Sequence, residues 1–243
     1  MARRRKKRDP DAQMSVIEHL GELRRRLIIS MIAIAVGAVV VFMIFNWLMG
    51  FLVGPYHDIT DQDLIFTGTG EAFATRLKVA TYGGFVLASP VVLWQVWRFV
   101  TPALNPKEKR YAIPFIVASL LFFALGAVVA WITFPRALDF LLGIGGDELE
   151  PFIAAGSYVS LVTLMMVAFG VAFEFPVLIV FLLMARVISV AQLTRWRRYV
   201  IVGVVAFAAV ITPSQDPYSL LLMAVPMWVF YEVAILIGRI MKR

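Results

Sequence analysis

Long apolar runs separated by short polar segments dominate the chain. Four of them are long enough to cross a bilayer as helices, namely residues 27–48, 82–100, 112–134 and 158–184. A hydrocarbon core of about 30 Å needs about 20 helical residues, so each run predicts a transmembrane helix. We expect the second helix to begin earlier, near Ala72, with its first turns at the membrane surface.

Two shorter apolar runs follow, at residues 199–211 and 220–237. The first holds 13 residues, which cover about 20 Å as a helix. Such a helix needs thinned lipid or shielding by its neighbours. The pattern therefore predicts an all-α membrane protein with six transmembrane helices, the last two short. No internal repeat is evident, so the inverted-repeat architecture of many carriers finds no support.

The composition agrees with a membrane protein and disfavours a soluble one. Hydrophobic residues make up 61% of the chain and charged residues 16%, whereas soluble domains carry about 45–50% and about 25%. The chain has no cysteine, which excludes disulfides and thiolate catalysis. Its net charge of +7 would suit nucleic acid, so the placement of the basic residues decides what that charge does.

Basic residues concentrate on alternate connections between the predicted helices. Residues 1–26 hold nine Lys and Arg, whereas residues 46–71 hold none and have four acidic residues. Residues 101–111 and 185–198 are again basic, and residues 135–156 are mainly acidic. By the positive-inside rule, both termini are predicted to be cytoplasmic. This topology accounts for the basic charge, and no binding of nucleic acid is expected.

The chain divides into a basic cytoplasmic tail, residues 1–14, and a single six-helix transmembrane domain, residues 15–243. The tail is expected to orient the chain and to contact anionic lipid. No cleavable signal peptide is apparent, because the first apolar run is too long for one.

A short amphipathic helix is predicted to lie on the cytoplasmic surface and to lead into the first span. Ser15 and Glu18 form a capping-box pattern at its start. Apolar side chains then recur at spacings of three and four, at Ile17, Leu20, Leu23 and Leu27. Glu22 lies off this stripe and four residues before Arg26, so spacing alone favours an ion pair within the helix.

Two carboxyl groups fall inside predicted spans. An unpaired charge at the bilayer centre costs at least about 2.5–3.5 kcal/mol, so Glu174 indicates either a functional group or a structural hydrogen bond within the bundle. Glu232 lies near the cytoplasmic end of the last span, where snorkelling or pairing with Arg239 is the simpler account.

Three prolines inside the predicted spans, Pro114, Pro176 and Pro226, predict kinks. Kinked helices together with two short ones suggest a curved bundle whose interior is incompletely filled.

Four motifs in order along the chain resemble those of the TatC family, the multispanning subunit of the twin-arginine protein translocase. Residues 18–26, EHLGELRRR, match the family's HLxELRxR start. Residues 89–104 match its SPxxxxQxxxFxxPAL block, and residues 169–176 match FGxxFExP. The fourth match, residues 212–219, departs from the usual TPPDxxSQ. Ser214 and Gln215 precede its aspartate, and Leu220 stands where glutamine is usual.

The resemblance implies a concave, glove-like bundle in the bacterial cytoplasmic membrane that receives twin-arginine signal peptides and passes folded proteins across. It implies that Glu22 and Glu108 bind the paired arginines, since carboxylates accept the planar guanidinium fork bidentately. The positions that match the family's signal-peptide site are His19, Glu22, Arg24, Gln95, Phe99 and Glu108. For Gln95 and Phe99, a role in helix packing is equally open. For His19, stabilisation of the first helix is equally open.

By the same resemblance, Glu174 and Pro176 face the concave side and contact partner subunits, while Asp216 and Pro55 lie in outer loops. The implied partners are twin-arginine signal peptides of folded cargo, single-span TatA-type and TatB-type subunits, and further TatC copies.

Two other functions compete with the translocase interpretation of this sequence. One is a proton-coupled carrier of small solutes that uses Glu174 as its proton site. The other, an intramembrane enzyme, lacks the cluster of polar residues at one depth that it would require. No P-loop, GxSxG or HExxH motif is present. His19 and His57 are predicted on opposite sides of the membrane. We expect no catalytic activity, no cofactor and no metal site.

Overall fold

The computed structural model describes residues 16–60, 62–100, 112–146 and 152–240. Within them the regular structure is helical apart from one isolated bridge between Ile65 and Ala154. The helices are α1 (Val16–Met43), α2 (Phe45–His57), α3 (Glu71–Val100), α4 (Ala112–Gly143), α5 (Ala155–Ala172), α6 (Phe175–Met184), α7 (Val190–Ile211) and α8 (Pro217–Ile240).

Five helical stretches in the described part of the chain are long and apolar enough to cross a membrane. They are α1, α3, α4, α5 with α6 as one unit, and α8. Most of their surface is apolar and exposed, as for example at Met31 and Val36 of α1. A surface of this kind needs lipid around it. The chain is therefore a multi-pass membrane protein.

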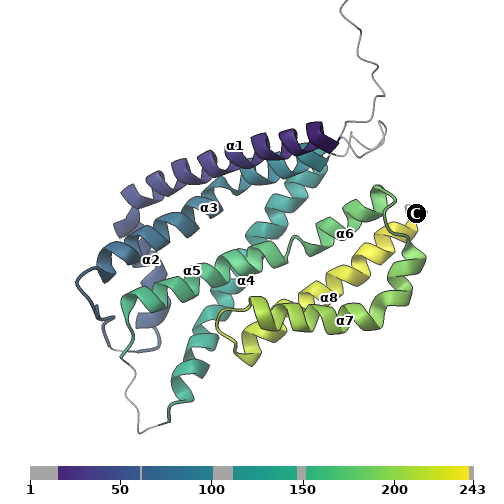
Figure 1. Cartoon of the computed structure of the whole chain (residues 1–243). Coiled ribbons are helices and arrows are strands. Elements are labelled where there is room, and N and C mark those ends of the chain that lie inside the picture. The colour runs from purple at the N-terminus through teal and green to yellow at the C-terminus, as the bar shows by residue number, and fades with distance from the viewer. Residues whose placement is uncertain (1–15, 61, 101–111, 147–151, 241–243) are drawn as a thin grey trace, which may run out of the picture.

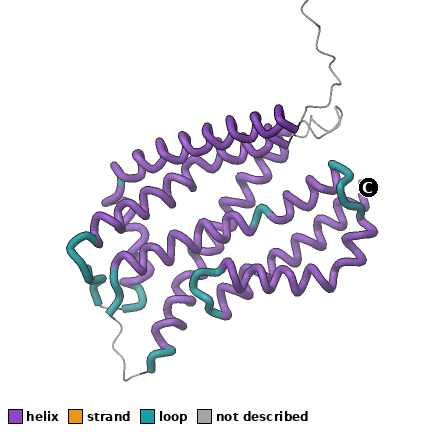
Figure 2. Tube along the Cα trace, in the orientation of Figure 1, coloured by secondary structure: helices purple, strands orange, loops and turns teal. Residues whose placement is uncertain are grey.

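The helices form a bundle in which α1 lies along α3, and α3 packs in turn on α5 (Figure 1). Helix α4 crosses behind α5, and α8 packs against both α6 and α7. Figure 2 shows that the described connections between these helices are short. The start of α1 and the end of α8 lie at the same end of the bundle (Figure 1). This end carries the predicted cytoplasmic segments.

Several predicted boundaries move. The fifth helix was expected to hold 13 residues, but α7 has 22 because the polar segment before Tyr199 continues it as helix. Helices α7 and α8, with 22 and 24 residues, are nevertheless shorter than α1, α3 and α4. The first amphipathic segment is continuous with the first span, as helix α1.

The prolines behave differently from one another. Pro176 follows a break between α5 and α6, as predicted. Pro114 lies in the first turn of α4, where proline is tolerated, so the kink expected there is wrong. Pro226 lies inside α8, which remains one helix from Pro217 to Ile240. Pro55, expected in a loop, is buried within the short helix α2.

Small residues bring the helix backbones together at two places. A Cβ atom on Gly84 of α3 would lie 2.4 Å from the backbone nitrogen of Ala38 in α1. A Cβ atom on Gly126 of α4 would lie 2.4 Å from the Phe169 carbonyl oxygen in α5. Close approach of this kind replaces the hydrophobic effect as the source of helix association in lipid. It fixes α1 and α3 as one rigid pair.

We expect Gly84→Ala to destabilise the protein, because the added methyl group must push α1 away from α3. Overpacking costs about 1–3 kcal/mol, which for a chain of this size lowers Tm by roughly 5 °C. Gly50→Ala in α2 is the matched control, since nothing lies within 4 Å of its added Cβ. Alanine favours helix over glycine, so the control should be neutral or stabilising. Thermal unfolding in detergent measures both, and equal Tm values would contradict the packing described here.

Candidate functional site

Five side chains from α1 and α3 meet at the end of the bundle where α1 begins and α3 ends, and we call them the α1–α3 polar cluster. Helix α1 supplies His19, Glu22 and Arg26, and α3 supplies Gln95 and Phe99. The spacings of three and four residues place each set on one face of its helix. Four of the five were predicted as site residues from the sequence. Arg26 was predicted only as an ion-pair partner of Glu22.

Arg26 bridges the two helices. Its Nη2 atom donates a hydrogen bond to Glu22 Oε1, so the ion pair predicted from spacing is confirmed. Its Nη1 atom donates to Gln95 Oε1 at 3.2 Å. The Glu22 and Arg26 side chains are only 18% and 17% exposed. The second carboxylate oxygen, Glu22 Oε2, is buried and has no hydrogen-bonding partner among the described residues.

An aromatic stack closes one side of the cluster. The rings of His19 and Phe99 lie with centroids 4.3 Å apart and planes 15° from parallel. Arg24 is exposed on α1. Glu108, the second predicted carboxylate, lies outside the described residues. The structure thus brings together His19, Glu22, Gln95 and Phe99, but not Arg24.

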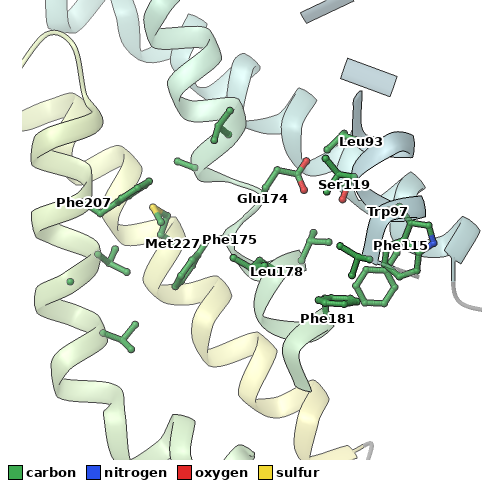
Figure 3. Close-up of a pocket in the computed structure, with 18 of the residues that line it drawn as sticks. Leu93, Trp97, Phe115, Ser119, Glu174, Phe175, Leu178, Phe181, Phe207 and Met227 are labelled. Carbon is green, nitrogen blue, oxygen red and sulfur yellow. The ribbon is translucent and has the colours of Figure 1, made fainter. Parts of the chain in front are cut away.

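A second feature is an apolar groove of about 990 Å³ beside the same end of α3. Its walls come from α3, α4, the α5–α6 junction, α7 and Met227 of α8. Figure 3 shows Leu93 and Trp97 on one side, and Phe207 and Met227 on the other. Glu174 carries the only carboxyl group among the described residues that line it.

Glu174 lies where the fourth predicted span breaks. Helix α5 ends at Ala172, and Glu174 is the N-cap residue of α6. Pro176 lacks an N–H group and so cannot continue the hydrogen bonding of α5. The Glu174 side chain does not cap α6 but points toward Ser119 of α4, within hydrogen-bonding reach (Figure 3). Its Oε1 atom is buried without a partner in the described part of the chain.

An ion pair joins the first turns of α7 to the last turns of α8. Arg197 Nη2 donates to Glu232 Oε2 at 2.5 Å, with both side chains partly exposed. The expected pairing of Glu232 with Arg239 is therefore wrong, because Glu232 pairs across to α7 rather than with a residue of its own helix.

Asp216 acts within the outer turn between α7 and α8. Its side chain is 1% exposed, and Oδ1 accepts the Ser219 backbone N–H at 2.8 Å, which caps α8. Oδ2 accepts the Ser214 hydroxyl. Ser214, which departs from the family pattern, therefore supports the cap. This geometry is structural, and it leaves no free oxygen for a ligand.

Sequence reasoning missed the polar contacts of three residues. Ser119 carries a hydroxyl within an apolar run, and this feature could have identified it as a partner of Glu174. Glu71, at the start of α3, accepts hydrogen bonds from the Thr67 hydroxyl at 2.7 Å and from the Gly156 backbone at 3.0 Å. Arg76 donates to the Phe42 carbonyl at 2.9 Å and so closes the end of α1. The Glu71–Gly156 and Arg76–Phe42 contacts join segments that are distant in sequence, and residue spacing does not reveal such contacts.

No group of three or more His, Cys, Asp or Glu within the described ranges is placed to hold a metal ion. The arrangement instead suits two kinds of contact. The Glu22 carboxylate can bind a cation, and the groove can accept an apolar segment.

Comparison with known proteins gives one consistent result. The family model of the Sec-independent protein translocase protein TatC matches residues 18–226. The TatC protein of Frankia casuarinae is 40% identical over 97% of this chain and 68% of its own length. That of Aquifex aeolicus is 40% identical over 95% of this chain and 97% of its own.

A crystal structure of the twin arginine translocase receptor TatC shares the fold. It is 39% identical to this chain, with a TM-score of 0.78, and the match covers 93% of this chain and 100% of that one.

Proposed function

Because the chain belongs to the TatC family of Sec-independent protein translocases, we propose that it is the receptor that binds twin-arginine signal peptides at the α1–α3 polar cluster. The family serves transport rather than catalysis. The chain is accordingly a translocase subunit.

The hydrogen bonding of the Glu22 carboxylate is the observation that supports the receptor function. Its carboxylate already accepts one guanidinium, from Arg26, and its second oxygen has no partner among the described residues. A carboxylate in this environment is suited to the arginine of a peptide, because the guanidinium fork can bond both oxygens. Glu108 is proposed to take the second arginine. That assignment rests on the family motif alone.

We propose six transmembrane helices with both termini cytoplasmic, in the bacterial cytoplasmic membrane. Helix α7 would be the additional span, with Arg195, Arg197 and Arg198 at the cytoplasmic surface and its apolar half in lipid. Residues 1–14 form the basic tail against anionic lipid, and residues 15–243 form one transmembrane domain. The common end of α1 and α8 supports this orientation (Figure 1).

The groove is proposed to accept apolar helices, both the hydrophobic part of the signal peptide and the single-span TatA-type and TatB-type subunits. Glu174 offers an oxygen that no described residue pairs, in an apolar wall, so a partner helix with a hydrogen-bond donor at that depth would gain affinity there. Further TatC copies complete the assembly. The rival function, a proton-coupled carrier, would use the same carboxyl group without any partner.

Loss of the Glu22 carboxylate is expected to abolish most signal-peptide binding. Glu22→Gln and Glu108→Gln should each weaken binding of a labelled twin-arginine signal peptide at least tenfold, as removal of one charged partner does. Glu18→Gln, one turn earlier on α1, removes the same charge outside the cluster and should have little effect. Fluorescence anisotropy with the full chain in lipid nanodiscs measures all three. Wild-type affinity in Glu22→Gln would sink the receptor site.

A different outcome is expected at Glu174. Glu174→Ala should lower co-purification of the single-span subunits severalfold, whereas Glu174→Gln, which keeps hydrogen-bonding atoms, should retain much of it. Neither change should alter the preference for an Arg-Arg over a Lys-Lys signal peptide, because Glu174 lies just before α6 and outside the polar cluster. Full assembly with Glu174→Ala, together with proton-dependent solute uptake by the wild-type chain alone, would favour the carrier function instead.

A further inference from the structure

Arg26 occupies the position that an incoming arginine needs. Its guanidinium bonds Glu22 Oε1, and the carboxylate and guanidinium are largely withdrawn from solvent. Glu22 Oε2 has no partner among the described residues. Because Arg26 neutralises the Glu22 carboxylate, a peptide cation, whether Arg or Lys, meets the full negative charge only after Arg26 has left, and an Arg can then bond both oxygens.

We infer that Arg26 is a built-in competitor for Glu22, which must release the carboxylate before a signal-peptide arginine can bind it bidentately. This inference rests on the proposed receptor function. It adds a residue that sets the strength of binding, and it assigns that role to a contact within the chain.

Gln95 provides the place to which Arg26 can withdraw. Its buried side-chain oxygen already accepts Arg26 Nη1 at 3.2 Å, so the guanidinium stays hydrogen-bonded when it leaves Glu22. The Gln95 amide is neutral and does not compete with Glu22 for the charge. Arg26 Nε is also without a partner in the described structure, which leaves the guanidinium a further donor during the exchange.

The backbone need not move for this exchange. Gly84 and Ala38 hold α3 and α1 in backbone contact, so the distance between the helices is fixed. The His19–Phe99 stack borders the cluster from the same two helices. The change is thus confined to the Arg26 side chain, whose length and flexible stem suit it.

A competitor of this kind sets a threshold without changing preference. When a site is open for only a fraction of the time, the apparent Kd of every ligand rises by the same factor. The ratio of affinities for Arg-Arg and Lys-Lys peptides is then a property of Glu22 and Glu108. Arg26 lowers both affinities together, which keeps weakly cationic segments of the cytoplasm from occupying the site.

The test is a binding titration of labelled Arg-Arg and Lys-Lys signal peptides with the full chain in nanodiscs. Arg26→Gln should raise affinity for both peptides by the same factor, roughly threefold to tenfold, as expected for the loss of a partly buried ion pair. Arg25→Gln is the matched control, because it removes the same charge from the exposed side of α1. The gain is counted relative to this control.

Two further variants make the result specific. In a Glu22→Gln background, Arg26→Gln should give no gain. Arg26→Lys keeps the charge but cannot bond Glu22 and Gln95 with two separate nitrogens, so it should give a smaller rise in the same direction. This variant carries the test if Arg26→Gln fails to fold.

The outcomes separate the two ideas. An affinity for Arg26→Gln equal to that of Arg25→Gln, or below it, overturns the competitor, and the lower value would make Arg26 a residue that positions Glu22. A gain that persists without the Glu22 carboxylate overturns it as well. If Glu22→Gln alone binds both peptides as the wild type does, the receptor site itself is wrong, whatever Arg26 does.

Discussion

A side chain that can ionise inside or beside a bilayer needs a partner, and this requirement organises the polar chemistry of the whole chain. Lipid supplies no hydrogen bonds, so each polar group must find a partner within the protein or lie at an interface. Arg26 meets the requirement between Glu22 and Gln95, and Arg197 meets it at Glu232. Glu174 meets it in part, toward Ser119, and its other oxygen has no partner in the described part of the chain. The incompletely satisfied carboxyl groups are therefore the positions at which a ligand or a partner gains most.

Helix α3 connects the two candidate sites. Near its C-terminal end, Gln95 and Phe99 contact α1, while Val96 and Trp97 line the groove. A signal peptide held at the polar cluster by its arginines would thus start beside the groove that suits its apolar part. The close contact of Gly84 with α1 keeps these two surfaces in fixed register. On the proposed function, α3 would therefore serve both the recognition of charge, with α1, and the entry of an apolar helix along the groove.

The apolar pattern predicted most of the fold, because helices in lipid need continuous apolar runs and their ends follow the charges. It predicted helices where α1 and α4 lie and a kink at Pro176, although α1 ends at Met43 and α4 continues to Gly143. It shortened α7, since the polar residues before Tyr199 gave no sign that the helix continues through them. The motifs identified four residues of the polar cluster. Contacts between distant segments, such as Arg197 with Glu232 or Glu71 with Gly156, depend on how helices cross, and helix periodicity carries no such information.

The proposed receptor function requires that the signal peptide meet the protein at the end of α1 and α3 that carries the polar cluster. Site-specific photo-crosslinking in membranes tests this directly, with the probe at Leu23, which is exposed beside Glu22, or at Phe66, which is exposed in the connection before α3, at the other end of that helix from Phe99. The account predicts a strong crosslink from position 23 to an Arg-Arg signal peptide, a weak one to a Lys-Lys peptide, and none from position 66. Equal crosslinking of the two peptides at position 23, or a crosslink only at position 66, would contradict it.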